Sequence, residues 1–433
     1  MTSLTRLLGL PRDELTDALR AAFPEAAEGP GRAAVPSEGP VGGRRAAVAR
    51  LREIDPIAYA TSRNHVGGAV TRLSPWLRHG VLSLAEVRDA ALARVPSPEH
   101  ASKLISELGW RDYWRQVHLA LGDGIRADIE PPAAAWRTPP RPGMPADVLE
   151  ARTGMACVNA FVRRLHETGW LHNHERMWLA SWLVHVRGVH WLSGADWFLE
   201  HLLDGDPASN HLSWQWVAGT FSAKPYLFNR ENLETFTSGA HCKGCGVAGH
   251  CDVEGTYDAL AARWFETETR LPPRPQLRIA PAASAPPPPA ITRPLVWLTL
   301  DSASATSPAV AAHPGAPKLF VVDPAWLVAE RPSLKRLVFL FECLADVADL
   351  EVLVGDPRLV VPTRITALGC DGAAVAATPC PRTLRAADEI AAEHPVAILP
   401  WPAFCDRSRV RDLGRFSRSW DKVSASAFRP TGG

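Results

Sequence analysis

Near the middle of the chain stands the segment Asp204-Gly-Asp-Pro-Ala-Ser-Asn-His-Leu-Ser-Trp-Gln-Trp216. Asp, Pro, Ser and Asn prefer caps and turns to helix interiors, so the pattern predicts a polar loop followed by a helix that starts near Asn210 or Ser213. Trp214 and Trp216 then both lie on that helix. Acids, an amide and indoles together suit a polar aromatic cofactor, which takes a few hydrogen-bonding groups in an apolar pocket. The simpler interpretation is a capped helix with core tryptophans.

The composition indicates two domains and no dominant charge. A chain of 433 residues is too long for one ordinary domain. Lys and Arg number 47 against 46 Asp and Glu, so there is no global basic excess of the kind that marks nucleic-acid binding, although a local basic groove is compatible with this balance. No apolar run is long enough to span a membrane and no signal-peptide core is present, so we expect a cytoplasmic protein without membrane contact.

Changes in composition divide the chain into five parts. Residues 1–45 hold one short helical pattern and then Pro/Gly/Ala-rich coil, so we expect a partly disordered segment. Residues 46–270 form a helical pattern, residues 271–294 a stiff polyproline-type linker and residues 411–433 a tail. Between linker and tail, residues 295–410 alternate strand and helix patterns, which predicts a doubly wound, Rossmann-like α/β domain. The fold class expected is therefore a mainly α domain followed by an α/β domain.

Two motifs of the helical part place polar groups where a ligand could use them. Thr71 and Ser74 stand at a helix start, where free N–H groups favour an anion such as a diphosphate; a plain N-cap is the simpler interpretation. Glu107, Trp110 and Arg111 fall on one helix face by their spacing. They make either a surface ion pair packed on an indole or the wall of a pocket that reads an extruded base.

Three thiols form a compact group after the helical run. Cys242, Cys245 and Cys251 lie within one short loop, which indicates a metal site because eight Cys otherwise scattered singly do not make a disulfide scaffold. Zinc would take these thiols with His241 or His250 as the fourth ligand. An iron–sulfur cluster needs four thiolates and therefore a Cys from elsewhere in the chain.

Over residues 46–270 these motifs resemble the photolyase and cryptochrome family. The resemblance rests on Asp204–Trp216, on Leu171–Met177, on Lys224–Asn229 and on Val70–Arg78, which is similar to the family's diphosphate clamp. It implies a FAD-binding helical domain. The cofactor-binding residues that it implies are Tyr59, Thr71, Arg72, Leu73, Ser74, Arg111, Asn173, Arg176, Asp204, Asp206 and Asn210.

The resemblance also implies a lesion pocket and an electron path. In the family the Glu-x-x-Trp-Arg motif lines the cavity for a flipped pyrimidine lesion. The pocket residues implied are Glu107, Trp110, His172 and Asn173. Trp214 and Trp191 match the inner and middle members of an indole chain that carries electrons to the flavin, and Trp136 is the candidate for its outer end.

A fourth thiol enters through the same resemblance. Thr153–Cys157 is similar to the Cys-bearing helix of bacterial photolyases that carry a [4Fe–4S] cluster. Cys157, Cys242, Cys245 and Cys251 are then the expected cluster ligands.

The α/β half resembles the antenna domain of the family. Val296-Trp-Leu, Phe320–Trp326 and Gly355-Asp-Pro357 carry this likeness. In the family that domain comes first in the chain, whereas here it comes last, which implies a circular permutation. The antenna chromophore stays unidentified.

The function implied is a light-driven, FAD-dependent DNA photolyase that acts as a monomer on damaged duplex DNA with a flipped lesion. His172 matches a histidine that (6-4) photoproduct enzymes use, and Asn173 matches dimer enzymes, so either lesion is possible. The alternatives are a cryptochrome-type blue-light photoreceptor without repair activity and a flavin-and-cluster protein without light chemistry.

Overall fold

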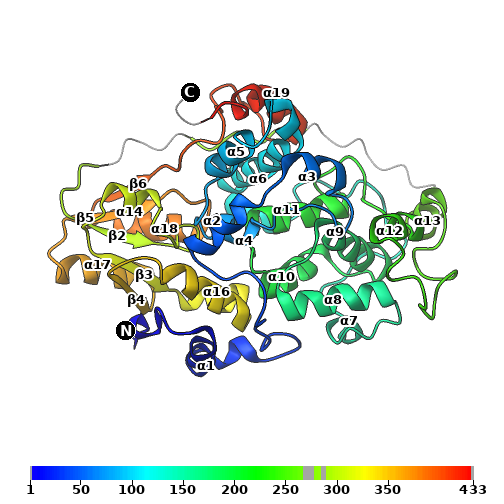
Figure 1. The fold of residues 1–433 in the computed structure, drawn as a ribbon, viewed down its shortest axis with the longest axis horizontal. Helices are drawn as coiled ribbons and strands as arrows, with labels where there is room; N and C mark the ends of the chain where they lie inside the picture. Colours follow the sequence, from blue (N-terminus) through cyan, green and yellow to red (C-terminus); the bar gives the residue numbers. More distant parts are fainter. Residues whose placement is uncertain (1, 267–276, 284–288, 431–433) are drawn as a thin grey trace.

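The structure is a computed structural model that describes residues 2–266, 277–283 and 289–430. Within them a helical half is followed along the chain by an α/β half, and the two pack side by side (Figure 1). The predicted fold class is thereby confirmed. Part of the predicted linker, residues 271–276 and 284–288, lies outside the described residues.

The helical half is built around an aromatic core. Phe161, Trp178, Leu183 and Phe198 are almost completely buried there. A π-helix at Trp182–Val186 continues one of the helices. The helices are α2 (Arg44–Arg52), α3 (Pro56–Ser62), α4 (Ser74–Arg78), α5 (Leu84–Leu92), α6 (Ser102–Leu121), α7 (Ala146–Leu149), α8 (Ala156–Thr168), α9 (Asn173–Ser181), α10 (Trp191–His201), α11 (Pro207–Ala218), α12 (Arg230–Thr237) and α13 (Tyr257–Trp264).

Helix α11 starts earlier than the sequence pattern predicted. Its first residue is Pro207, and the side chain of Asp206 accepts a hydrogen bond from the Ala208 N–H at 3.3 Å. Proline suits the first helical position because it lacks an N–H there, and an aspartate is a good N-cap. The expected start near Asn210 or Ser213 was therefore wrong by about one to two turns.

The α/β half contains a six-stranded sheet with the order β1-β4-β3-β2-β5-β6. All neighbouring strands are parallel except β1, which pairs antiparallel with β4. The strands are β1 (Thr2–Ser3), β2 (Pro294–Leu298), β3 (Lys318–Val322), β4 (Leu350–Val354), β5 (Gly372–Ala376) and β6 (Val396–Leu399). The helices that follow them are α14 (Pro308–Ala312), α15 (Pro324–Glu330), α16 (Leu334–Leu344), α17 (Pro357–Ala367) and α18 (Pro381–Ile390).

Successive residues of the central strand β2 face two different cores. Leu295 and Trp297 pack with apolar residues of α17 and α18. Val296 and Leu298 belong to a larger core that includes α16 and extends into the helical half. Because strand side chains alternate between faces, one strand serves both layers. The sheet face on the α16 side is thus the one that joins the two halves.

The N-terminal segment corrects an expectation. Partial disorder was predicted for residues 1–45, whereas β1 extends the sheet and helix α1 (Arg12–Ala22) packs against α16. Leu15 and Leu19 are buried in that contact, because their i, i+4 spacing places them on one helix face. The short helical pattern predicted in this segment is thus confirmed by α1, whereas the partial disorder expected from the Pro/Gly-rich composition is not.

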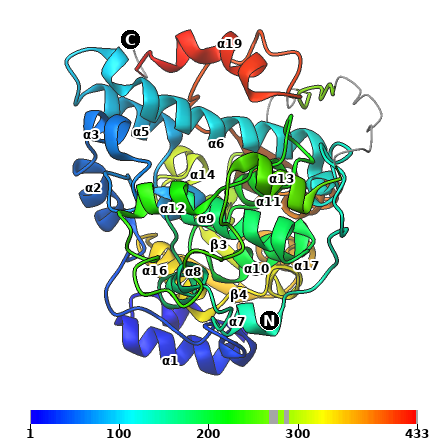
Figure 2. The ribbon, with the colours of Figure 1, turned by 90° about the vertical axis from the view of Figure 1, so that its right-hand side faces the viewer.

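The C-terminal segment returns to the helical half. Helix α19 (Phe416–Ala427) lies along α6, as Figure 2 shows. The predicted tail at 411–433 thus contains an ordered helix that packs on α6. No helix within the described residues combines the length and the apolar character needed to cross a membrane.

Candidate flavin and lesion site

A cavity of about 300 Å³ opens among α3, α4, α6, α9, α10 and α11. Most of the predicted cofactor and lesion residues meet in its wall, although they come from distant parts of the chain. The predicted residues that line it are Tyr59, Thr71, Arg72, Ser74, Glu107, Arg111, His172, Asn173, Arg176, Asp204, Asn210 and Trp214. Leu73, Trp110, Asp206 and Trp191 lie outside this lining.

Two arginine–aspartate pairs with buried carboxylates hold the loop between α10 and α11. The Arg176 guanidinium contacts both carboxylate oxygens of Asp204, at 3.0 and 3.1 Å, and Arg111 lies 3.2 Å from Asp206. Burial favours the protonated acid, yet Arg176 outweighs it and holds the pKa of Asp204 below its usual range. Burial also raises the pKa of Asp206, but the charges of Arg111 and Arg78 and a hydrogen bond with Ser209 together outweigh it and lower that pKa well below its usual range. Both acids are therefore ionised at neutral pH.

The diphosphate-clamp segment brings a strained arginine to the cavity. Arg72 has a φ of 54°, a left-handed conformation that is uncommon outside glycine. Its guanidinium lies over the ring of Trp170, 4.6 Å from the centroid. Trp170 lines the cavity and was missed by the sequence reasoning, although it directly precedes the Leu171–Met177 motif. Thr71 and Ser74 add hydroxyl groups beside this cation.

Glu107 forms ion pairs at one side of the cavity. Its carboxylate lies 3.2 Å from Arg63 and 3.1 Å from Lys103, and its side chain is 29 % exposed. The phenol of Tyr59 is nearby, where burial and then the negative charge of Glu107 raise its pKa to about 12. This carboxylate is thus a hydrogen-bond acceptor held in place by two cations.

His172 caps α9 and is completely buried. Its Nδ1 accepts a hydrogen bond from the His174 N–H at 3.2 Å, and its Nε2 lies 2.9 Å from the Arg63 carbonyl oxygen. Because Nδ1 is an acceptor, the ring proton sits on Nε2 and is donated to that carbonyl. Burial, above all, lowers the pKa of His172 to about 4. The imidazole is neutral, and both ring nitrogens have backbone partners.

The amide side chains of the site differ in exposure. Asn173, the first residue of α9, is exposed, and its nitrogen approaches the Met177 sulfur at 3.3 Å. Asn210 donates from its amide nitrogen to the Ala195 carbonyl at 2.8 Å, which fixes the orientation of this amide in the wall.

Trp214 is buried in the wall and depends on a glycine. A Cβ added to Gly194 would lie 2.2 Å from the Trp214 ring, so only glycine allows this approach. Trp191 begins α10, one turn before Gly194, and donates to Asp128 at 2.7 Å. Trp136 donates to His185 at 3.1 Å. The two indoles predicted for electron transfer thus lie on neighbouring helices, and their role stays a prediction.

The prediction that Glu107, Trp110 and Arg111 share one helix face is wrong for Trp110. Leu104, Leu108 and Arg111 point into the cavity, whereas the Trp110 indole stacks on Phe416 of α19. Residues at i and i+3 differ by about 60° around a helix, enough for α19 to cover one and not the other. The structure therefore does not bring Trp110 into the cavity wall with Glu107 and His172.

The four predicted cysteine ligands line one small cavity of about 20 Å³. All four are free thiols. Burial raises the pKa of Cys157 to about 12, and burial together with Glu234 raises that of Cys242 to about 11. Among the described residues no group of three or more His, Cys, Asp or Glu is placed to hold a metal ion. The distant Cys157 does meet the loop cysteines, and both the iron–sulfur and the zinc assignment stay predictions.

Comparison with known proteins points to the same cofactor as the residues that line the cavity. Residues 104–242 match the family described as the FAD binding domain of DNA photolyase. The deoxyribodipyrimidine photo-lyase of Streptomyces griseus is 39% identical over 158 residues, which cover 36% of this chain and 33% of the relative. Cryptochrome DASH of Ostreococcus tauri is 34% identical over 206 residues, covering 43% of this chain and 36% of the relative.

Solved structures with similarity include a bacterial class III photolyase from Agrobacterium tumefaciens, with 27% identity, a TM-score of 0.37 and coverage of 45% of this chain and 43% of that one. A Synechocystis cryptochrome has 26% identity, a TM-score of 0.41 and coverage of 47% and 44%. The chain therefore spans less than half the length of each of these relatives. The matched residues include α6, α9 and α11 with the two arginine–aspartate pairs, so the helical half of this chain is similar to the FAD binding domain of DNA photolyase.

Proposed function

We propose that this protein is a light-driven, FAD-dependent DNA photolyase that repairs cyclobutane pyrimidine dimers. The observation that carries the proposal is the cavity whose wall contains Asp204 paired with Arg176, Arg111 paired with Asp206, and Trp214, all within the residues that match the FAD-binding family. Relatives named deoxyribodipyrimidine photo-lyase support the same activity. When bound in its reduced form, FAD supplies an electron on absorbing blue light.

The side chains of the cavity suit FAD at both ends. Arg72, Thr71 and Ser74 offer a cation and hydroxyl groups for the diphosphate. Arg176, Asp204 and Asn210 offer charge and an oriented amide for the ring system, whose electron-rich reduced state is stabilised by a guanidinium. The chain's own contribution is to orient the cofactor and to exclude water from it.

The state of His172 favours the cyclobutane dimer over the (6-4) photoproduct. Splitting a cyclobutane ring breaks two carbon–carbon bonds and, once the electron returns, moves no proton. Reversing a (6-4) bond also returns a heteroatom group from one base to the other, which requires a proton donor. His172 is neutral at physiological pH and its single ring proton is held by the Arg63 carbonyl. A histidine in this state is a helix cap, not an acid.

Glu107 and Asn173 are the side chains proposed to meet the damaged bases. Both line the cavity, and an extruded base needs a polar edge partner. Because Glu107 is already held by Arg63 and Lys103, its carboxylate accepts a base N–H without reorganisation.

The test is repair of two defined substrates. The FAD-loaded protein is illuminated with blue light on one oligonucleotide with a single cyclobutane dimer and on another with a single (6-4) photoproduct, each with a dark control. We expect light-dependent repair of the dimer only. Repair of the (6-4) product would contradict the role given to His172, and no repair of either would favour the photoreceptor alternative. The comparison is made at low and high salt, since phosphate contacts alone mimic binding at low ionic strength.

We further propose that Cys157, Cys242, Cys245 and Cys251 hold a [4Fe–4S] cluster. The support is that four thiols from two distant segments share one cavity. The raised pKa values of Cys157 and Cys242 mean that metal uptake must displace protons, so loading should be favoured at higher pH. Anaerobic purification should yield about four irons with acid-labile sulfide. Stoichiometric zinc, or neither metal nor sulfide, would contradict this assignment.

The α/β half is proposed to be the family's antenna domain placed after the flavin domain. Its support is the parallel sheet with helices on both faces that follows the helical half. We expect the protein to act as a monomer in the cytoplasm, with damaged duplex DNA as its partner.

A further inference from the structure

The peptide between the two cavity acids is held by arginines. The carbonyl oxygen of Gly205 accepts a hydrogen bond from Arg78 Nε at 2.9 Å and from Arg336 Nη2 at 3.3 Å. Asp204 precedes this glycine and Asp206 follows it. A Cβ added to Gly205 would lie 2.7 Å from the Arg336 guanidinium, so a larger residue here would displace that group.

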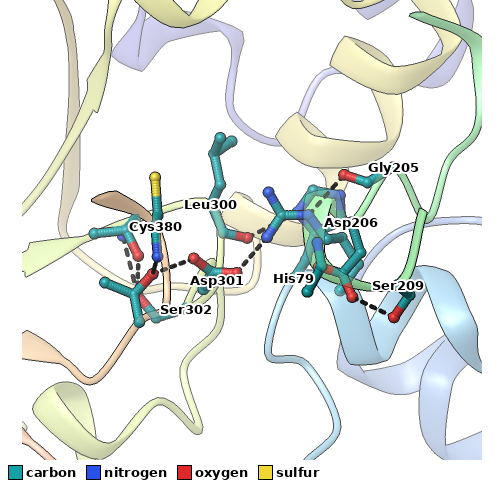
Figure 3. A network of polar contacts seen from close by, with 12 residues as sticks. His79, Gly205, Asp206, Ser209, Leu300, Asp301, Ser302 and Cys380 are labelled. Atoms are coloured by element: carbon teal, nitrogen blue, oxygen red, sulfur yellow. Dashed lines mark hydrogen bonds and ion pairs between the residues drawn. The ribbon is translucent and has the colours of Figure 1, made fainter. Parts of the chain in front are cut away.

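Arg78 is in turn bound by an acid of the α/β half. Its Nη1 donates to Asp301, whose other carboxylate oxygen accepts from the hydroxyl of Thr378. Arg78 is 4 % and Asp301 6 % exposed, so this is a buried ion pair. Figure 3 shows Asp301 between the strand-end residues Ser302 and Cys380 on one side and Gly205 on the other.

The origin of these groups explains why they meet. Asp301 and Thr378 follow β2 and β5, two neighbouring parallel strands, and the carboxyl ends of parallel strands lie at one edge of the sheet. Arg78 ends α4 in the helical half. Arg336 lies on α16 and also pairs with Glu330 at 3.1 Å. The edge of the sheet therefore contacts the loop that carries the flavin-site acids.

The charges at this contact depend on one another. Burial alone lowers the pKa of Arg78, but Asp301, and after it Asp206, raise that pKa above its usual range. Arg115 of α6 also acts on both Asp206 and Asp301. His79, next to Arg78, is kept neutral: burial and the charge of Arg78 lower its pKa to about 3. Without Asp301, the charge of Arg78 is left facing Asp206, which Arg111 already neutralises.

We propose that Asp301 of the α/β half is a positioning residue for the flavin site, acting through Arg78 and the Gly205 carbonyl on Asp204 and Asp206. This inference rests on the proposed binding of FAD in the cavity. Asp301 does two things. Through Arg78 it holds the Gly205 peptide in place, and its carboxylate supplies one negative charge that balances the arginines around Asp204 and Asp206. Removing one partner from a buried ion pair leaves an uncompensated charge, so we expect the loop that carries Asp204 and Asp206 to become less well held.

The first test is Asp301→Asn in the FAD-loaded full-length protein. The amide keeps the size of the side chain and removes its charge. We expect the midpoint potential of the bound flavin to become more positive, because loss of a negative charge favours the electron-rich reduced state. Asp323→Asn is the matched control: Asp323 also follows a strand of the sheet, but its cationic neighbour is Arg382 at 3.7 Å. It should leave the potential unchanged.

A second test does not depend on flavin. Hydrogen–deuterium exchange of the apoprotein is followed over residues 202–210. Thr378→Val removes one hydrogen bond from Asp301, keeps all charges and does not touch the loop. We expect faster exchange of 202–210 in both Thr378→Val and Asp301→Asn, with the protection of α8 and α9 unchanged. Exchange that rises everywhere would mean general destabilisation and would overturn the proposal.

The outcomes separate this inference from the proposed function. If the variants bind FAD with the wild-type potential and show wild-type exchange over 202–210, Asp301 is not a positioning residue, whatever the protein repairs. If the wild-type protein takes up no FAD, the proposed function fails, and the exchange experiment still decides whether Asp301 holds the loop.

Discussion

The indole of Trp110 lies flat against the ring of Phe416, with ring centroids 3.8 Å apart and planes 15° apart. Phe416 in turn stacks on Trp420, and Gly109 lies so close to the Trp420 ring that an added Cβ would come within 2.2 Å of it. The C-terminal helix thus covers one face of the tryptophan that the family resemblance assigns to the lesion.

Polar contacts also hold the segment that leads into α19, residues 407–415, on the helical half. Arg415 contacts both carboxylate oxygens of the buried Glu130, at 2.7 and 3.0 Å, and the Tyr113 hydroxyl donates to the Leu413 carbonyl at 2.6 Å. Arg407 pairs with Asp112. The covering of Trp110 is therefore part of the ordered fold.

The first prediction concerns the strength of this stack. Trp110→Ala and Phe416→Ala should each destabilise the protein, and the double variant should lose less than their sum. Aromatic pairs contribute about 0.5–1.5 kcal/mol beyond the apolar area that they bury, and the coupling should fall in this range. Urea unfolding of the four proteins measures it. A coupling of zero would show that the ring contact adds nothing to the docking of α19.

The second prediction separates packing from lesion binding. Because the Trp110 indole stacks on Phe416 and lies outside the cavity lining, Trp110→Ala should weaken binding of a dimer-containing duplex no more than Phe416→Ala does, with FAD retained in both. Phe416→Ala is the matched control, since it removes the same stack with α19 and keeps the indole. A loss of about one to two orders of magnitude in Trp110→Ala alone, which is the size expected for a base stacked on the indole, would contradict this prediction.

The third prediction concerns electron transfer. Trp214→Phe should abolish fast flavin photoreduction in transient absorption, because Trp214 is the indole in the cavity wall. Gly194→Ala should slow it as well, since a methyl group there must displace the Trp214 ring. Trp197→Phe serves as control: Trp197 is buried on the same helix α10 but lies outside the cavity lining. Unchanged kinetics in Trp214→Phe would reject the assignment.

The fourth prediction is loss of stability in mild acid. Burial, above all, lowers the pKa of His118, His172 and His185 to about 4, below the value of about 6.5 in unfolded chains. The unfolded state then binds more protons between these two values, so the free energy of unfolding should fall as the pH drops from about 6.5 toward 4. Melting temperatures at several pH values measure this.

The variant His118→Gln tests how much of this loss of stability in acid is due to His118. His118 has a ring nitrogen, Nδ1, without a hydrogen-bond partner, so His118→Gln should remove its titration at little structural cost. The pH dependence of the melting temperature should become shallower in this variant. An unchanged dependence would show that His118 is not among the groups responsible.

Local patterns in the sequence carried much of the fold and of the site. The alternation of strand and helix patterns after residue 295 predicted the α/β half, and the polar segment Asp204–Asn210 predicted residues that the structure places in or beside one cavity. These features depend on neighbours along the chain, namely on periodicity, capping and turn preference, which a single sequence displays directly.

Contacts between distant segments decided the rest. Arg78 and Asp301 are 223 residues apart, and Trp110 and Phe416 still further, so no local pattern could pair them. The partner of the His172 Nε2, the Arg63 carbonyl, likewise comes from a distant segment, the end of α3. Which face of α6 meets the cavity and which meets α19 depends on how whole helices pack, and that packing is set by the summed burial of both halves rather than by any one motif.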